Sequence, residues 1–158
     1  MKSLLRMHHP SALQDVVLLL ARLGLGAVLI AHGWQKFDDQ GLEATAAGFD
    51  GMGIPYPEAA AQYATYVELV GGAMLVVGLL TPLVGLLVAG DMAGAFWFAH
   101  RDAGVFVDEG GWELVAVIGL LALTLVATGA GRLSVDRLIA GGQRRDASVA
   151  PERELVDA

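Results

Sequence analysis

The chain has 158 residues, a formal net charge of −7 and no cysteine, and 55% of its residues are hydrophobic. This length fits one domain, and the acidic balance disfavours nucleic-acid binding, which needs Lys and Arg against phosphates. Without cysteine, the chain forms no disulfide, thiolate nucleophile, iron–sulfur cluster or cysteine-ligated zinc site. A pI near 4.9 together with a mean hydropathy of +0.57 means that acidic and apolar residues occupy separate parts of the chain.

Four long stretches carry almost no charge, and they predict membrane-spanning helices. They cover residues 16–31, 59–80, 83–99 and 114–128. Each approaches the ~20 residues that cross a hydrocarbon layer of ~30 Å. A soluble four-helix bundle would need a polar stripe on each helix, whereas residues 16–20 are apolar on all sides. We therefore expect an all-α, integral membrane four-helix bundle over residues 15–140, in a multi-pass protein of the cell membrane.

Basic residues predict the orientation of this bundle. Residues 1–15 and the segment from residue 129 onwards hold seven Lys and Arg, whereas residues 33–58 and 101–113 hold only Lys36 and Arg101. The positive-inside rule therefore places both termini in the cytoplasm. Residues 1–14 would form a cytoplasmic arm, and residues 141–158 a polar tail that we expect to be disordered.

The links between the spans have different lengths. The link at residues 80–83 is short, and Pro82 suits the first turn of a new helix, so the second and third spans should form a tight hairpin. The outer link is longer, with helical character at residues 41–49 and a turn at residues 51–57. Trp34, Trp97 and Trp112 fall at predicted outer helix ends, where indole rings favour the headgroup region.

Three charged residues, Arg22, Glu68 and Asp91, lie well inside the apolar stretches. At 1.5 Å per residue, all three fall roughly 14 to 18 Å from the cytoplasmic edge, so we expect them to meet in one buried polar network. Small residues on the same helix faces, such as Gly26 and Gly72, would let the helices approach closely. Two interpretations remain open for this network: ion pairing that fixes helix register, or a site for a ligand or a proton path.

A second polar cluster is predicted at the outer end of the bundle. It consists of His32 and Lys36 on the first helix, His100 at the end of the third and Glu113 at the start of the fourth. Such donors and acceptors beside apolar walls suit a quinone headgroup, but they also suit polar residues that only cap helices and meet water. Ligation of a b-type haem by the two histidines is disfavoured, because Gly33 and Trp34 follow His32 directly. We assign no metal site and no catalytic residue.

These residues carry a resemblance to the DoxX family of small four-helix membrane proteins. The matching elements, in chain order, are Arg22-x-x-x-Gly26, His32-Gly33-x-x-Lys36-Phe37, Gly53-Ile54-Pro55-x-Pro57, Glu68-x-x-Gly71-Gly72, Gly78-Leu79-x-Thr81-Pro82 and Gly129-x-Gly131-x-x-Ser134-x-Asp136. The resemblance covers roughly residues 15 to 140. It implies a relation to the membrane subunit of a thiosulfate:quinone oxidoreductase and to membrane components of redox or detoxification assemblies.

The resemblance and the outer cluster together favour a membrane subunit of a quinone-linked complex, with quinone as the candidate cofactor. Its partners would be the lipid bilayer and a redox partner subunit, or further copies of the chain. Two alternatives stay open: a non-catalytic anchor or scaffold for a soluble enzyme, and a transporter of protons or small solutes. Any redox chemistry must come from a bound cofactor or a partner, because no cysteine supplies it.

Overall fold

A computed structural model describes residues 12–148 of the protein, with side chains described as far as Gly141. Every regular element in this range is helical. The α-helices are α1 (Ala12–Trp34), α2 (Leu42–Gly51), α3 (Pro57–Tyr66), α4 (Gly72–Val77), α5 (Thr81–Ala95), α6 (Glu113–Thr128) and α7 (Val135–Ser148). Three π-helical turns, η1 (Gln35–Asp39), η2 (Val67–Gly71) and η3 (Phe96–His100), and a 3₁₀ turn, η4 (Val107–Glu109), complete the description.

The π-turns lengthen the α-helices: η1 extends α1, η2 joins α3 to α4, and η3 extends α5. Among the described residues, three continuous helical stretches are long and apolar enough to cross a membrane: Ala12–Asp39, Pro57–Val77 and Thr81–His100. The fourth predicted span corresponds to α6, a shorter apolar helix of 16 residues. The expectation of an all-helical protein is therefore confirmed for the described residues, and at least three of its helices are long and apolar enough to span a membrane.

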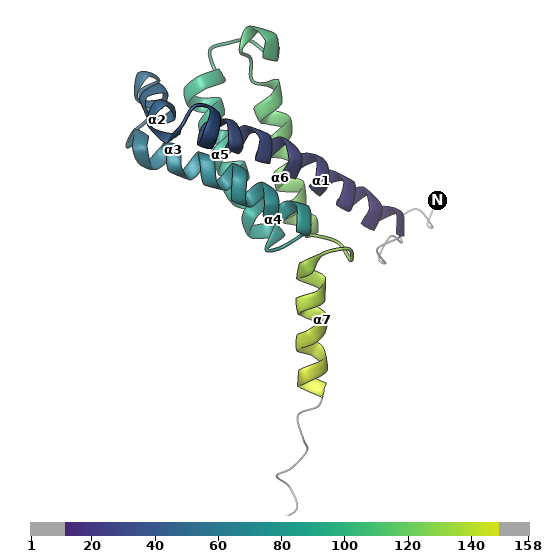
Figure 1. Ribbon diagram of the computed structural model, residues 1–158. Coiled ribbons are helices and arrows are strands. Elements are labelled where there is room, and N and C mark those ends of the chain that lie inside the picture. The colour runs from purple at the N-terminus through teal and green to yellow at the C-terminus, as the bar shows by residue number, and fades with distance from the viewer. Residues whose placement is uncertain (1–11, 149–158) are drawn as a thin grey trace, which may run out of the picture.

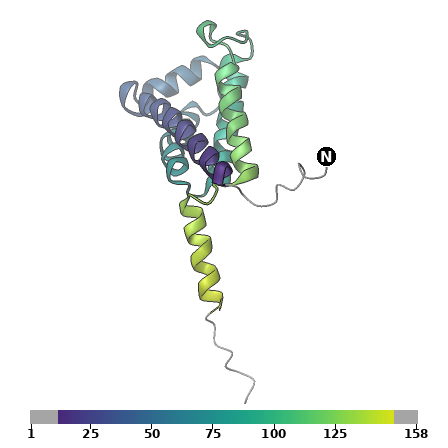
Figure 2. The same cartoon turned by 90° about the vertical axis from the view of Figure 1, so that its right-hand side faces the viewer.

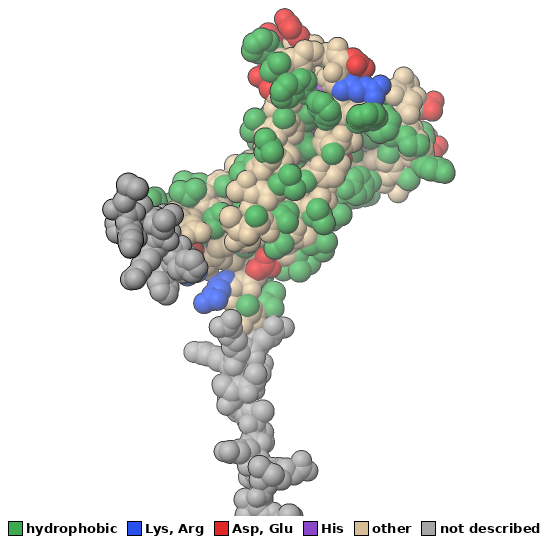
Figure 3. Space-filling view, turned by 180° about the vertical axis from the view of Figure 1, so that it is seen from behind, with side chains coloured by type: hydrophobic (Ala, Val, Ile, Leu, Met, Phe, Trp, Pro, Cys, Tyr) green, Lys and Arg blue, Asp and Glu red, His purple; other side chains and the backbone are tan. Residues whose placement is uncertain are grey.

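The core lies where α1 and α4 pack against α5 and α6, and it is built from aliphatic side chains such as Leu29, Leu75 and Val88. Many equally apolar residues face outwards, for example Leu86 and Leu120. Figure 3 shows one face of the molecule, where charged side chains gather towards the ends and hydrophobic and uncharged ones cover the body between them. A protein that is apolar both inside and outside is suited to lipid.

Glycines set the closest helix crossings. A Cβ at Gly26 would lie 2.7 Å from the carbonyl oxygen of Gly72, and one at Gly33 would lie 2.5 Å from the backbone nitrogen of Leu69. On the other side of the bundle, a Cβ at Gly85 would lie 2.9 Å from the carbonyl oxygen of Ala122. The small-residue faces of the first two spans thus bring their backbones into contact, as expected.

The hairpin between α4 and α5 is tight, as the short link predicts. Gly78 (φ 72°) and Leu80 (φ 49°) both adopt the left-handed conformation. A residue distant in sequence holds the turn, because the Asp136 carboxylate accepts hydrogen bonds from the backbone N–H groups of Leu80 (2.7 Å) and Thr81 (3.0 Å). Asp136 thereby caps the N-terminus of α5.

Figures 1 and 2 show α7 projecting from one end of the bundle, while α2 and the 101–112 loop lie at the other. We refer to these as the α7 end and the loop end. The expected helix and turn at residues 41–57 are present as α2 and the bend that follows it. Residues 1–11 of the expected N-terminal arm and residues 149–158 of the tail lie outside the described range. Where the sequence predicts disorder from Gly141, α7 continues to Ser148. The Ser134 Oγ accepts from the backbone N–H of Arg137 at its start.

Candidate functional site

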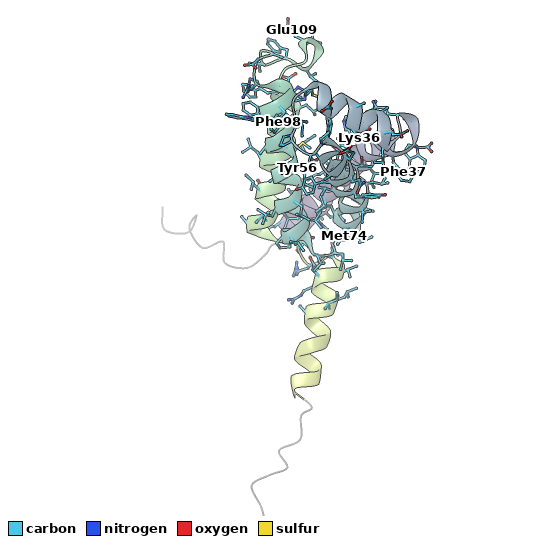
Figure 4. All side chains as sticks on the ribbon, turned by 90° about the vertical axis from the view of Figure 1, so that its left-hand side faces the viewer. Lys36, Phe37, Tyr56, Met74, Phe98 and Glu109 are labelled. Carbon is cyan, nitrogen blue, oxygen red and sulfur yellow. The ribbon has the colours of Figure 1, made fainter. Side chains whose placement is uncertain are left out.

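A cavity of about 520 Å³ lies at the loop end of the bundle. Apolar side chains including Leu29, Phe98 and Ile118 form most of its wall. Six residues with polar side-chain groups also line it: His32, Lys36, Tyr63, Glu68, Asp91 and His100. Figure 4 shows Lys36 and Phe98 on the loop-end half of the bundle, with Met74 towards the α7 end. The cavity therefore joins residues from both clusters that the sequence suggests.

Each of the three long helical stretches brings a polar residue to the cavity on a π-turn. Lys36 lies in η1, Glu68 in η2 and His100 in η3. A π-turn adds one residue to a helical turn, which changes the direction of the side chains around it, and such turns are frequent at functional sites. Sequence periodicity does not reveal π-turns. The direction in which these three side chains point could therefore not be predicted from the sequence.

Lys36 and Glu68 form the central polar contact. The Lys36 Nζ lies 2.5 Å from the Glu68 Oε2, and the two side chains are 19% and 6% exposed. A buried carboxylate needs such a partner, because burying a lone charge is costly. The sequence places Lys36 in the outer cluster and Glu68 in the buried network, so this pairing was not predicted.

Asp91 faces the same cavity without a partner of its own. The residue is 9% exposed, and its Oδ2 has no hydrogen-bond partner within residues 12–148. Glu68 and Lys36 both interact with it electrostatically. The cavity thus contains one paired carboxylate and one carboxylate whose hydrogen-bonding capacity is unused.

The remaining polar side chains of the cavity differ in how many of their hydrogen-bonding atoms have partners. The Tyr63 hydroxyl donates to the carbonyl oxygen of Leu87 at 2.8 Å. The Nδ1 of His100 lies 2.7 Å from the carbonyl oxygen of Gly110. A carbonyl only accepts, so Nδ1 carries the proton in this contact and Nε2 is the free ring nitrogen. His32 also lines the cavity, from the helical turn that precedes Lys36.

Glu113, the fourth residue of the expected outer cluster, is not among the residues that line the cavity. Its Oε1 accepts a hydrogen bond from the backbone N–H of Val107 at 2.8 Å. The side chain therefore fixes the loop between α5 and α6. The sequence predicts that Glu113 belongs to one cluster with His100. In the structure its carboxylate instead binds the backbone of the loop.

Arg22 lies towards the α7 end, apart from Glu68 and Asp91. Its Nη2 donates to the carbonyl oxygen of Leu133 (2.5 Å) and its Nη1 to that of Leu75 (3.4 Å). The helix crossing explains the separation. Arg22 precedes Gly26 by one turn and Glu68 precedes Gly72 by one turn on an antiparallel helix, so the two residues lie about 12 Å apart along the axis.

Arg22 belongs to a polar cluster that connects the C-terminal segment to the bundle. The Asp136 caps on α5 lie beside it, and Asp136 interacts electrostatically with Arg22. An ion pair also connects the C-terminal segment to α1, because the Arg132 Nε lies 2.5 Å from the Asp15 Oδ2. The sequence pattern does not show that Asp136 caps a helix that begins more than fifty residues earlier in the chain.

Comparison with known proteins identifies the family. The DoxX family model matches residues 17–101, which is more than half of the chain. The chain belongs to the DoxX family. A second model, described as TQO small subunit DoxD, matches residues 61–149. The DoxX match contains all six polar cavity residues, and the DoxD match contains the Asp136 caps.

Relatives of this DoxX-family chain come from several bacteria. A Bacillus subtilis protein named "Putative oxidoreductase CatD" is 30% identical over 130 residues, which are 82% of this chain and 92% of that protein. An uncharacterised membrane protein of Mycobacterium tuberculosis is 32% identical over 73% of this chain and 77% of its own length. An uncharacterised protein of Haemophilus influenzae is 30% identical over 73% of this chain and 84% of its own length. No solved structure matches the chain. With its apolar helices, this family membership makes the protein a multi-pass membrane protein.

Proposed function

We propose that this protein is the membrane subunit of a quinone-linked redox complex in the cell membrane, and that the loop-end cavity holds the quinone headgroup. The observation that carries the proposal is the composition of the cavity. Apolar walls surround a small set of polar side chains, including His32, Lys36 and His100. A volume of about 520 Å³ lies within the range of roughly 300 to 1,000 Å³ for small-molecule sites.

Quinone chemistry suits this arrangement. A quinone ring is flat and apolar and has two carbonyl acceptors, so it needs donors at its edge and aliphatic or aromatic side chains against its faces. His32 can donate through its ring N–H, and Lys36 can donate through the ammonium N–H groups that its bond to Glu68 does not use. Phe98 and Ile118 supply apolar contact surface.

The electrons for such a site would come from a partner subunit. The chain has no cysteine and therefore no thiol chemistry of its own. One matching family model is described as a small subunit, and one relative is named an oxidoreductase. The first name supports a membrane component that works with a second protein, and the second name supports a redox role.

The proposed topology has four spans with both termini in the cytoplasm. Helix α6 would be the fourth span, since this 16-residue, mostly apolar helix runs alongside α5. This arrangement directs the loop end, and with it the quinone cavity, towards the outer side of the membrane. The basic residues at the α7 end, such as Arg132 and Arg137, support it.

The proposal is tested by quinone binding to the purified protein in lipid nanodiscs. Titration with a short-chain ubiquinone should give saturable binding, and His32→Ala should raise Kd about five- to tenfold through loss of one hydrogen bond. Asp102→Asn is the control, because the Asp102 side chain is exposed and does not line the cavity. Lys36→Ala should also weaken binding, although it disturbs Glu68 as well. Absence of binding in the parent protein, or equal Kd values for the parent and both cavity variants, would contradict the proposal.

A further inference from the structure

Asp91 is the polar residue of the cavity whose role the proposed function does not explain. A carboxylate only accepts hydrogen bonds when it is ionised. We propose that Asp91 is ionised when its ligand is bound, and that it thereby makes the cavity selective for the hydroxyl-bearing, reduced form of the ring, the quinol, over the carbonyl-bearing quinone. This inference rests on the proposed function, since it names which form of the ligand the same site prefers.

The Asp91 carboxylate has unused hydrogen-bonding capacity. Asp91 is 91% buried, given its 9% exposure, and its Oδ2 has no hydrogen-bond partner among residues 12–148. Buried polar atoms in folded proteins are almost always hydrogen-bonded. An unpartnered carboxylate oxygen at a cavity wall is therefore stabilised by a ligand that donates to it.

The neighbouring donors make their hydrogen bonds to other acceptors. The Lys36 ammonium contacts Glu68 at 2.5 Å. The Tyr63 hydroxyl donates to the Leu87 carbonyl oxygen. Neither group bonds to Asp91, although both interact with it electrostatically. The missing donor is thus expected to come from the molecule that enters the cavity.

Two glycines leave open space on the helix that carries Asp91. Gly90 and Gly94 lie on the same helix and also line the cavity. A Cβ at Gly94 would meet nothing within 4 Å, and the nearest atom to one at Gly90 is the Tyr63 hydroxyl oxygen at 3.5 Å. The helix that carries Asp91 therefore leaves open space in the cavity, and the apolar side chains of Met92 and Ile118 line the same cavity.

A neutral hydroxyl suits the surroundings of Asp91 better than an ammonium group does. An organic cation would also donate to Asp91, but it would approach the positive charge of Lys36, which already interacts with that carboxylate. A neutral hydroxyl avoids this repulsion and suits the apolar wall. A quinone carbonyl would instead place an acceptor against an acceptor. The quinol is therefore the form that satisfies Asp91.

The test compares the two redox forms of one ligand. Short-chain ubiquinol and ubiquinone would be titrated anaerobically into the parent protein, Asp91→Asn and the control Asp102→Asn, whose carboxylate lies on the exposed loop. The parent should bind the quinol about tenfold more tightly, as expected for one hydrogen bond to a charged group. That ratio corresponds to a rise of about 30 mV in the potential of the bound two-electron couple. Asp91→Asn should bind both forms with similar Kd, and Asp102→Asn should keep the preference.

Each other outcome overturns the inference in a recognisable way. Equal binding of both forms by the parent, or tighter binding of the quinone, contradicts the role of Asp91 but leaves the proposed function standing. Binding of neither form contradicts both. Tighter binding of a benzylammonium probe than of the quinol would assign the site to a cation. If Asp91→Asn does not fold, the ratio measured for the parent protein still decides the question.

Discussion

Lys36 and Glu68 form a 2.5 Å ion pair that links the end of the first helical stretch to the middle of the second. Side chains on a helix tilt towards its N-terminus. The two stretches are antiparallel, so Lys36 leans towards the α7 end and Glu68 leans towards the loop end. The two side chains therefore meet although their backbones lie at different depths, and their contact places both on the cavity wall.

The first prediction concerns the stability of this pair. Lys36→Met leaves the Glu68 carboxylate buried without a cation and should destabilise the protein by about 3 to 5 kcal/mol. The double variant Lys36→Met/Glu68→Gln removes both charges and should recover most of this loss. Thermal unfolding in detergent measures all three proteins. If the double variant is less stable than Lys36→Met alone, the pair does not have the role assigned to it.

The second prediction concerns the crossing of the first two helical stretches. A Cβ at Gly33 would overlap the backbone of Leu69, whereas one at Gly24 would meet nothing within 4 Å. Gly33→Ala should therefore cost about 1 to 3 kcal/mol through overpacking. Gly24→Ala, on the same helix, is the matched control and should leave the melting temperature unchanged or raise it slightly. Equal effects of the two substitutions would show that the helices do not approach at Gly33.

The third prediction concerns Arg22. Arg22→Met removes the donors to the carbonyl oxygens of Leu75 and Leu133, at a cost of about 1 to 3 kcal/mol for each acceptor left unsatisfied. The turn around Leu133 should then become more accessible, which hydrogen exchange of residues 129–136 would report. Arg101→Met is the control, because its guanidinium is half-exposed and stacks on Trp97. Unchanged exchange in Arg22→Met would contradict the contact.

The fourth prediction tests the membrane topology. The chain has no native cysteine, so single cysteines can be labelled without background. Asp108→Cys at the loop end should react with an impermeant maleimide added to whole cells. Leu138→Cys, at an exposed position of α7, should react only after the membrane is opened. Labelling of both sites from outside would contradict the proposed orientation, and an odd number of spans would explain it.

Much of the fold follows from hydropathy and local signals. Apolar stretches predict the long helices, Pro82 and the short link predict the hairpin, and the helical character of residues 41–49 corresponds to α2. These features depend on neighbouring residues. They can therefore be derived without knowing how the helices pack.

The site was only partly predictable, because its geometry depends on packing. Counting residues placed Arg22 at the depth of Glu68, but the Gly26–Gly72 crossing separates them. The π-turns that carry Lys36, Glu68 and His100 leave no mark in the sequence pattern. His32, Lys36 and His100 do share one cavity as residues of the outer cluster, whereas Glu113 caps a loop.

Photoaffinity labelling with an azido-quinone would test the central claim, that the loop-end cavity binds a quinone, most directly. The labelled protein would be digested and the modified peptides identified by mass spectrometry, with and without an excess of unlabelled ubiquinone. The account predicts labelling that excess quinone suppresses, within residues 29–36 and 90–100, which border the cavity. Labelling spread over the lipid-facing side chains and unaffected by the competitor would contradict it.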